Sequence, residues 1–206
     1  IGVAERPRGR HVRGLGLGEC ALTVAPRSSY LPPELEGGER VFGLAGHLYT
    51  LRGSHDHGIG DFTALAELAE AAGGQGARIL GLNPLHALFP QDRRRASPYH
   101  PSDRRFLDPI YIDVGALAGP ASVNDALAAG QGEFMALAAR GDVDYAGVWS
   151  AKRAVLEAAF HATTDLPDAD FAQLVTEGGA PLQRFAAVQR LARQLAKVNW
   201  RGRQDG

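Results

Sequence analysis

The stretch that decides the fold runs from residue 41 to residue 85 and contains three apolar segments. The first, VFGLAGHLYTL at residues 41–51, is a short run typical of a buried β-strand. The second, GDFTALAELAEAAGG at residues 60–74, has apolar residues at helical spacing, with Asp61 as the expected N-cap and Gly73 as the expected end. The third, ARILGLNPL at residues 77–85, again has the pattern of a strand. Strand, helix and strand in this order predict a βαβ unit with parallel strands.

The segment before this unit, residues 1–40, is rich in Gly, Pro and Arg. Its one alternating apolar patch, GECALTVAP at residues 18–26, predicts a strand that ends at Pro26. The following YLPPELEGG, at residues 30–38, has the composition of a loop or linker. We therefore expect residues 1–40 to be the end of a β-rich domain.

In the segment after the unit, residues 122–206, helical periodicity runs from residue 122 to residue 198, with no strand pattern between the helices. Ser122 and Asp125 resemble a capping box, and Pro181 is placed where the first turn of a helix tolerates proline. The four apolar stripes are Val123, Leu127, Phe134 and Leu137; Trp149, Leu156 and Phe160; Phe171, Leu174 and Val175; and Leu182, Phe185, Leu195 and Val198. Four helices in a row interrupt a β/α alternation, so we expect an inserted helical subdomain here, with residues 41–121 as the βαβ part.

Composition narrows the class of protein. The chain has 206 residues, 45% of them hydrophobic and 22% charged, and a formal net charge of -1. This balance gives no electrostatic reason to expect nucleic acid or an anionic membrane as a partner. No apolar run approaches the roughly 18 residues of a membrane span. The single cysteine, Cys20, excludes an intramolecular disulfide and favours a cytoplasmic location, and Ile1 in place of an initiator methionine favours a cut end of a longer chain.

A proline-rich stretch, ASPYHPSDRRFLDPIYIDV at residues 96–114, follows the second predicted strand. Ligands of α/β proteins bind at the carboxyl ends of parallel strands, which is where this stretch is expected to lie. Pro98 restricts Ser97 to extended geometry, and Pro101 does the same for the residue after Tyr99. A tyrosine held in this way offers a flat apolar face and a hydroxyl group, which suit a sugar ring. The alternative is that Tyr99 packs against its own scaffold.

Four blocks of the chain resemble the amylomaltase, or 4-alpha-glucanotransferase, family. They are GIGDFTALAELA (58–69), ILGLNPLHALFP (79–90), SPYHPSDRRFLDPIYIDV (97–114) and VDYAGVWSAKRAVLEAAF (143–160), and ECALTVAP and YLPPEL resemble the end of the family's N-terminal β-domain. The family's enzymes are retaining α-glucan disproportionating enzymes with a TIM-barrel catalytic domain. The resemblance therefore implies an α/β fold, with the first strands of a partial TIM (β/α) barrel, an inserted helical subdomain, and the end of a β-rich domain before them.

The resemblance also assigns candidate site residues. Tyr99 matches the family's tyrosine that stacks against the glucose at the cleavage point, and Ser97 and Pro98 belong to the same motif. Apart from the resemblance, His86 is expected to form hydrogen bonds in the pocket or to sugar hydroxyls. The resemblance implies maltooligosaccharides or other α-1,4-glucans as partners. The chain departs from the family where His57 replaces the usual Trp, Asp103 the usual Ser and Asp108 the usual Asn.

The sequence does not contain the motifs that carry the family's catalytic carboxylates. Retaining glycosyl transfer needs two carboxyl groups about 5 to 5.5 Å apart. The family carries them in motifs that resemble R-I-D-H and G-E-D-L-G, and neither occurs in this chain. We therefore assign no catalytic residue, and expect the carboxylates outside this chain and no need for a metal or organic cofactor. His55, Asp56 and His57 are expected to form a solvated loop.

Two other functions compete with a glucanotransferase fragment. One is a non-catalytic maltodextrin-binding or regulatory fragment. The other is a sugar-phosphate site formed by the basic residues at 93–95 and 104–105, although we expect these arginines to be ion-paired or solvated. The scattered histidines give no metal-binding pattern, and the sequence leaves the oligomeric state open.

Overall fold

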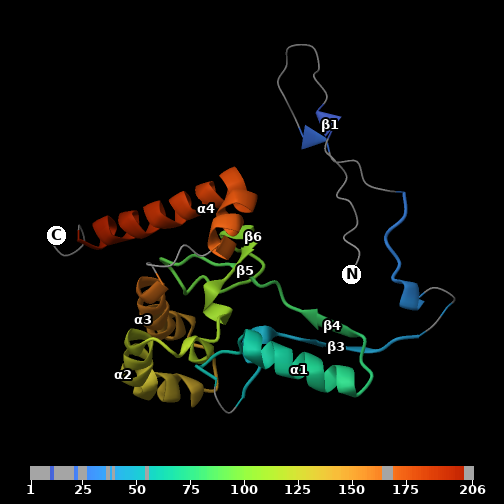
Figure 1. The fold of residues 1–206 in the computed structure, drawn as a ribbon, viewed down its shortest axis with the longest axis horizontal. Coiled ribbons are helices and arrows are strands. Elements are labelled where there is room, and N and C mark those ends of the chain that lie inside the picture. The colour runs from blue at the N-terminus through green and yellow to red at the C-terminus, as the bar shows by residue number, and fades with distance from the viewer. Residues whose placement is uncertain are drawn as a thin grey trace. The chain divides into compact units, whose positions relative to one another are not determined.

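The computed structural model describes residues 10–11, 21–22, 27–35, 38, 40–53, 56–163 and 169–201 (Figure 1). The chain divides into two compact units, residues 1–41 and 42–206. Among the described residues, no helix is long and apolar enough to cross a membrane.

Among the described residues, the first unit contains one small sheet. Strands β1 (Arg10–His11) and β2 (Ala21–Leu22) are antiparallel, with Arg10 opposite Leu22. Of the strand predicted at residues 18–26, β2 is present, and the other residues of that range lie outside the described part of the chain. The linker segment contains a 3-10 turn, η1 (Pro33–Leu35).

The predicted βαβ unit is present in the second unit. Strands β3 (Gly43–Gly46) and β4 (Ile79–Leu82) pair in parallel, and helix α1 (Phe62–Gly74) connects them in sequence. Asp61 is the N-cap, because its carboxylate accepts a hydrogen bond from the Ala64 N–H at 3.0 Å. The helix ends one residue after the predicted Gly73. The end of the first predicted strand forms instead a 3-10 turn, η2 (Leu48–Thr50).

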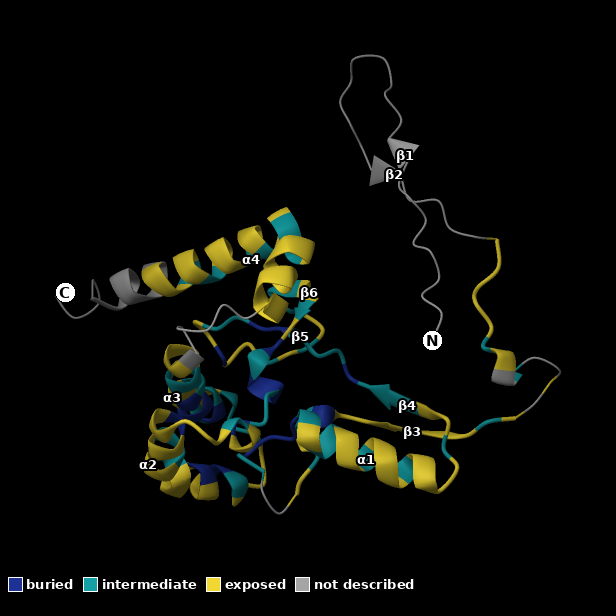
Figure 2. Ribbon diagram, in the orientation of Figure 1, coloured by how far each residue is buried: buried dark blue, intermediate teal, exposed yellow. Residues whose placement is uncertain are grey.

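The prediction that these strands are buried is wrong for β3. All four residues of β3 are exposed, and the side chains of Leu44 and Ile79 keep 44% and 54% of their accessible surface. Figure 2 shows the contrast, with exposed residues along β3 and α1 and buried ones around α2 and α3. The reason is that β3 and β4 form a sheet of only two strands among the described residues, so their side chains have few neighbours.

The helical region contains α2 (Ala121–Ala138), α3 (Tyr145–Thr163) and α4 (Ala169–Arg201). Gly179 interrupts α4 with a positive φ of 47°, which favours glycine, so α4 consists of two helices. Pro181 lies just after this break, as expected for the first turn of a new helix. The described part of this region thus has the four predicted helices and no strand.

Two details of these helices differ from expectation. The capping box at Ser122 is wrong, because α2 begins at Ala121 and Pro120 occupies the cap position without a side-chain hydrogen bond. In α3 the most buried apolar residues lie on a neighbouring stripe: Val148 and Val155 are buried, whereas Phe160 is exposed. The third predicted stripe, on α4, is also exposed. Amphipathic spacing alone does not fix which flank meets a neighbouring element.

The core lies between α2, α3 and the 3-10 turn η3 (Pro109–Tyr111), not within a sheet. Its buried members are Leu48, Ile59, Ile110, Tyr111, Val114, Val123, Phe134, Leu137, Val148, Ala151 and Val155. The last part of the proline-rich stretch, with Ile110, Tyr111 and Val114, is therefore anchored in this core.

Candidate functional site

The proline-rich stretch belongs to a loop closed by two short strands. Strand β5 (His86–Ala87) pairs antiparallel with β6 (Asp103–Leu107), with an irregular register between them. Residues 88–102 form the excursion between the two strands, and we call them the Tyr99 loop. In the chain the loop follows β4 and β5.

Tyr99 lies at an exposed turn of this loop. Tyr99 keeps 59% of its accessible surface, Ser97 is also exposed, and Pro98 is half-buried. The N–H of His100 donates to the carbonyl of Ser97 at 3.2 Å, which closes the turn around Pro98 and Tyr99. The ring is thus presented outward and does not pack in the core, so the scaffold-packing alternative loses support.

His86 is half-buried at the base of the loop. Among the described residues, no hydrogen bond or ring contact joins it to Tyr99. Asp103, on the facing strand, forms an ion pair with Arg105, with Oδ2 and Nη2 2.6 Å apart. Hydrogen bonds from the side chain and backbone of Arg105 lower the pKa of Asp103 to about 2, so this carboxylate is ionised at neutral pH.

A buried ion pair holds the base of the Tyr99 loop. The Arg93 guanidinium donates from Nη1 to Oδ2 of Asp108 at 2.7 Å, and both side chains are at most 4% exposed. The Asp108 carboxylate also accepts from the N–H groups of Leu88 at 2.6 Å and Ile110 at 2.9 Å. On its other side, the Arg93 guanidinium lies 4.1 Å from the centre of the Trp149 ring on α3. One cation therefore connects the loop, η3 and a helix of the core.

The other arginines of this region are also occupied or solvated, as expected. Arg95 lies over the ring of Phe89 at 4.0 Å, and Arg105 is paired with Asp103. Because Arg93 is neutralised by Asp108 in the interior, it is not available to a phosphate. The sugar-phosphate alternative therefore has little support in this geometry.

The second half of α4 provides another contact to the hairpin. Phe185 stacks on Phe106 of β6, with ring centres 4.3 Å apart and planes at 22°. Gln189 donates from Nε2 to the Ser102 hydroxyl at 3.0 Å. The Tyr99 loop thus has contacts with both α3 and α4.

The segment expected to be a solvated loop is partly buried, so that prediction is wrong for Asp56 and His57; His55 lies outside the described residues. The Asp56 side chain is 8% exposed and accepts from the Gly58 N–H at 2.8 Å. The His57 side chain is 14% exposed, and its ring meets the edge of Phe134 with centres 4.6 Å apart. The cause is a tertiary contact with α2, which the local sequence does not reveal.

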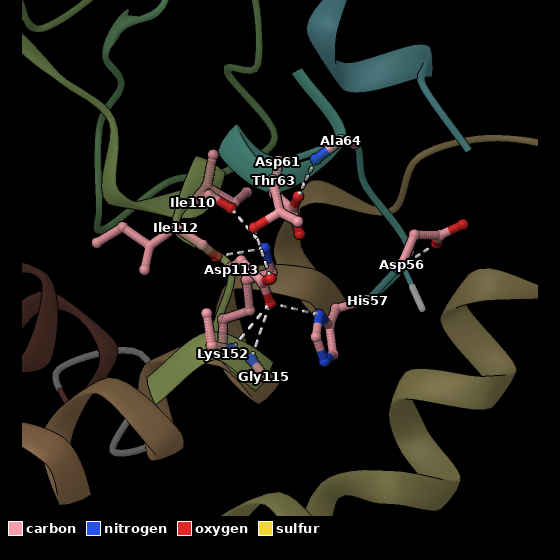
Figure 3. A network of polar contacts seen from close by, with 12 residues as sticks. Asp56, His57, Asp61, Thr63, Ala64, Ile110, Ile112, Asp113, Gly115 and Lys152 are labelled. Atoms are coloured by element: carbon pink, nitrogen blue, oxygen red, sulfur yellow. Dashed lines mark hydrogen bonds and ion pairs between the residues drawn. The ribbon is translucent and has the colours of Figure 1, made fainter. Parts of the chain in front are cut away.

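Around His57, Asp61 from the same segment and Asp113 from a distant part of the chain converge (Figure 3). Asp113 accepts from the Thr63 hydroxyl at 2.7 Å and from the Gly115 N–H at 2.9 Å. Its Oδ1 lies 3.9 Å from Nδ1 of His57, too far for a hydrogen bond, and this buried nitrogen has no hydrogen-bond partner in the structure. Burial and, secondarily, the charge of Lys152 lower the pKa of His57, which favours the neutral imidazole.

Lys152 is a fully buried lysine that the sequence reasoning missed. Its ammonium donates to the carbonyls of Ile110 at 2.9 Å and Ile112 at 2.8 Å. Burial lowers the pKa of Lys152 to about 8, although the charges of Asp61 and Asp113 act in the opposite direction. The sequence hints at its burial only through the position of Lys152 next to the apolar stripe of α3. Lys152 ties the segment after the Tyr99 loop to the core.

A groove of about 780 Å³ opens beside this network, between α1 and α2. It is lined by Asp56, His57, Thr63, Glu67, Asp113, Gly115, Leu127, Ala128, Gln131, Phe134, Met135 and Ala138. No residue of the Tyr99 loop lines it, so the groove and the predicted sugar contact are separate places.

Donor atoms of His57, Asp61 and Asp113 lie within 4.8 Å of one another. The two carboxylates already have structural roles, since Asp61 caps α1 and Asp113 accepts hydrogen bonds from Thr63 and backbone N–H groups. The charge of the buried Lys152 also opposes a cation at this point. We therefore interpret this cluster as a structural network.

Comparisons with known proteins identify relatives. The family model described as 4-alpha-glucanotransferase matches residues 46–205. The 4-alpha-glucanotransferase of Haemophilus influenzae is 43% identical over 93 residues, which are 45% of this chain and 13% of that protein. The 4-alpha-glucanotransferase of Mycobacterium tuberculosis is 40% identical over 125 residues, which are 55% of this chain and 17% of that protein.

The chain is also similar to the crystal structure of amylomaltase from Corynebacterium glutamicum. The TM-score is 0.59 and the identity 32%, with 69% of this chain and 21% of that chain covered. The fold is accordingly α/β and similar to that of an amylomaltase. The match spans less than a fifth of the length of these curated relatives.

Proposed function

This chain belongs to the 4-alpha-glucanotransferase family, and from that premise we propose that it is part of an enzyme that transfers α-1,4-glucan segments between maltooligosaccharides. We place the enzyme in the cytoplasm. In this proposal β3, α1 and β4 are the first part of a TIM barrel, and residues 122–206 belong to a helical subdomain inserted in it. The alternative of a non-catalytic maltodextrin-binding fragment has no specific observation in its favour.

The observation that carries the proposal is the position of Tyr99. Tyr99 is 59% exposed on a turn that follows the parallel strand β4 in the chain, and α/β enzymes bind their ligands at the carboxyl ends of such strands. A sugar ring has one face of C–H groups that packs on an aromatic ring, and hydroxyl groups that can bond to the phenol. Ser97 and Pro98 set the backbone on which Tyr99 is presented, and His86 lies at the base of the same hairpin.

The proposed reaction is a retaining double displacement. One carboxylate attacks the anomeric carbon, while a second carboxyl group gives its proton to the departing 4-oxygen of the donor glucan. The 4-hydroxyl of an acceptor glucan then attacks the glucosyl-enzyme ester and returns a proton to the second group. Both carboxylates belong to polypeptide outside these 206 residues, and the step needs no metal or organic cofactor.

The test uses the full-length protein that contains this chain. We expect it to convert maltotriose into glucose and longer glucans, and we expect Tyr99→Ala to lower kcat/KM roughly 100-fold, the loss of about 3 kcal/mol of binding. Tyr99→Phe keeps the ring and should lose less. Tyr30→Ala, at a tyrosine that is 79% exposed in the first unit, is the matched control and should not change activity.

Two outcomes would overturn the proposal. One is a full-length protein without transfer activity on maltooligosaccharides. The other is a Tyr99→Ala variant with unchanged kcat/KM, which would remove the sugar contact from this loop.

A further inference from the structure

The base of the Tyr99 loop contains a buried arginine, Arg93. A contribution to the free energy of folding is a poor explanation for its burial. Arg93 is 5% exposed and Asp108 is 1% exposed. Removing two charges from water costs several kcal/mol per ion, and apolar replacements of buried ion pairs are often as stable or more stable. The Nε of Arg93 is in addition buried without a hydrogen-bond partner among the residues that the structure describes, which is a further cost.

The planar shape of the Arg93 guanidinium allows it to contact Asp108 and Trp149 together. Its Nη1 donates to the Asp108 carboxylate at 2.7 Å, while its central carbon, Cζ, lies over the Trp149 ring, 4.1 Å from the ring centre. A planar cation can satisfy a carboxylate and an aromatic face simultaneously, whereas the compact ammonium of lysine cannot do both. The contact therefore specifies both a distance and an orientation.

The ion pair also joins two positions of the chain on either side of Tyr99, the proposed substrate contact. Arg93 and Asp108 are 15 positions apart, and Tyr99 lies between them in sequence. Asp108 simultaneously accepts N–H groups from Leu88, at the start of the loop, and from Ile110, in η3. The start of the Tyr99 loop and η3 are thus fixed to one carboxylate, and Arg93, inside the loop, connects that carboxylate to α3 through Trp149.

We propose that Arg93 is a positioning residue of the glucan site, which acts through Asp108 and Trp149 to fix where Tyr99 lies. It touches no substrate itself. The inference rests on the proposed function of the Tyr99 loop and adds a residue that controls the geometry of the site. A displacement of about 1 Å at a site of this kind costs on the order of 100-fold in rate, so a loosened loop should be visible in kinetics.

The experiment is a double-mutant cycle in the full-length enzyme, with maltotriose as substrate. Arg93→Lys keeps the charge and loses the planar contact, and we expect kcat/KM to fall about 10-fold while the Tm changes by only a few degrees. In a Tyr99→Ala background the same substitution should change kcat/KM less than twofold, because Arg93 acts through Tyr99. The matched control, Arg105→Lys on β6, replaces an arginine that is 56% exposed and should leave kcat/KM unchanged.

A second variant covers the case in which Arg93→Lys does not fold. Trp149→Phe keeps an aromatic ring under the guanidinium but weakens the cation–π contact. We expect a loss of about threefold in kcat/KM, which again disappears in the Tyr99→Ala background.

The outcomes separate this inference from the proposed function. An enzyme whose kcat/KM is insensitive to Tyr99→Ala contradicts the proposed function itself. A strong effect of Tyr99→Ala with no effect of Arg93→Lys or Trp149→Phe overturns the positioning role alone. The positioning role is also overturned if Arg93→Lys lowers kcat/KM equally with and without Tyr99, because that result indicates a general structural role.

Discussion

The βαβ unit and the α2–α3 pair differ in what their apolar side chains contact. The strands β3 and β4 have the parallel register of an α/β fold, yet Ile79 on β4 is 54% exposed. By contrast, Ile110 in η3 and Val148 in α3 are fully buried in the helical core. The same kinds of residue are thus paired through the backbone in one region and packed through side chains in the other. Backbone pairing and core formation are separable in this chain.

The largest expected effect is a difference in stability between two Ile→Ala variants of the 206-residue chain, one in each region. Ile110→Ala should lower the free energy of unfolding by about 2–5 kcal/mol, because it leaves a cavity in a packed core. Ile79→Ala is the matched control and should cost less than about 1 kcal/mol, since most of that side chain already contacts water. Urea unfolding monitored by circular dichroism measures both, and equal losses would contradict the comparison.

The second prediction concerns Lys152, the buried cation of the helical core. Its pKa is lowered from 10.5 to about 8, so between these values the unfolded chain binds more protons than the folded one. The free energy of unfolding should therefore rise with pH from about 8 towards 10, by about 2–3 kcal/mol. Urea unfolding at pH 7.5, 8.5 and 9.5 measures this slope.

Lys152→Met removes the titrating group and should flatten the slope. The range ends near pH 10 because burial raises the pKa of Tyr111 from 10.0 to about 12. That phenol stabilises the fold below pH 10 and loses this contribution above it, so the two effects would oppose each other. A slope that persists in Lys152→Met would show that another group is responsible.

The smallest effect is expected at His57, which lies at the boundary between the two regions. Its pKa is lowered from 6.5, so the folded chain resists protonation and the free energy of unfolding should fall as the pH drops below 6.5. His57→Phe keeps a ring against Phe134 and should remove this part of the pH dependence. Unfolding curves at pH 7.5, 6.5 and 5.5 test it, and an unchanged slope in the variant would exclude His57 as the cause.

The sequence predicts the local parts of this structure well. Asp61 caps α1, β3 and β4 are parallel, and Pro181 follows the break in α4, because each depends on a few neighbouring residues or on a fixed period. The failures are of another kind. The N-terminus of α2 is set by Pro120 and not by the Ser122 pattern, and a periodic stripe on α3 does not say which flank is buried.

The candidate site divides in the same way. The exposed turn at Tyr99 follows from Pro98 and Pro101, which restrict the backbone before them whatever surrounds the loop. The burial of His57, the pairing of Arg93 with Asp108, and the contacts of Lys152 with the carbonyls of Ile110 and Ile112 each join segments far apart in sequence. No local pattern encodes them.

By itself, the sequence determined the βαβ unit, the four helices and the stiff tyrosine turn, because steric limits and hydrophobic periodicity act over a few residues. Only the tertiary structure decided which ionisable groups are withdrawn from water and what holds the tyrosine turn in place. Desolvation and ion pairing depend on which elements meet in space, and that is settled when α2, α3 and η3 pack around one core.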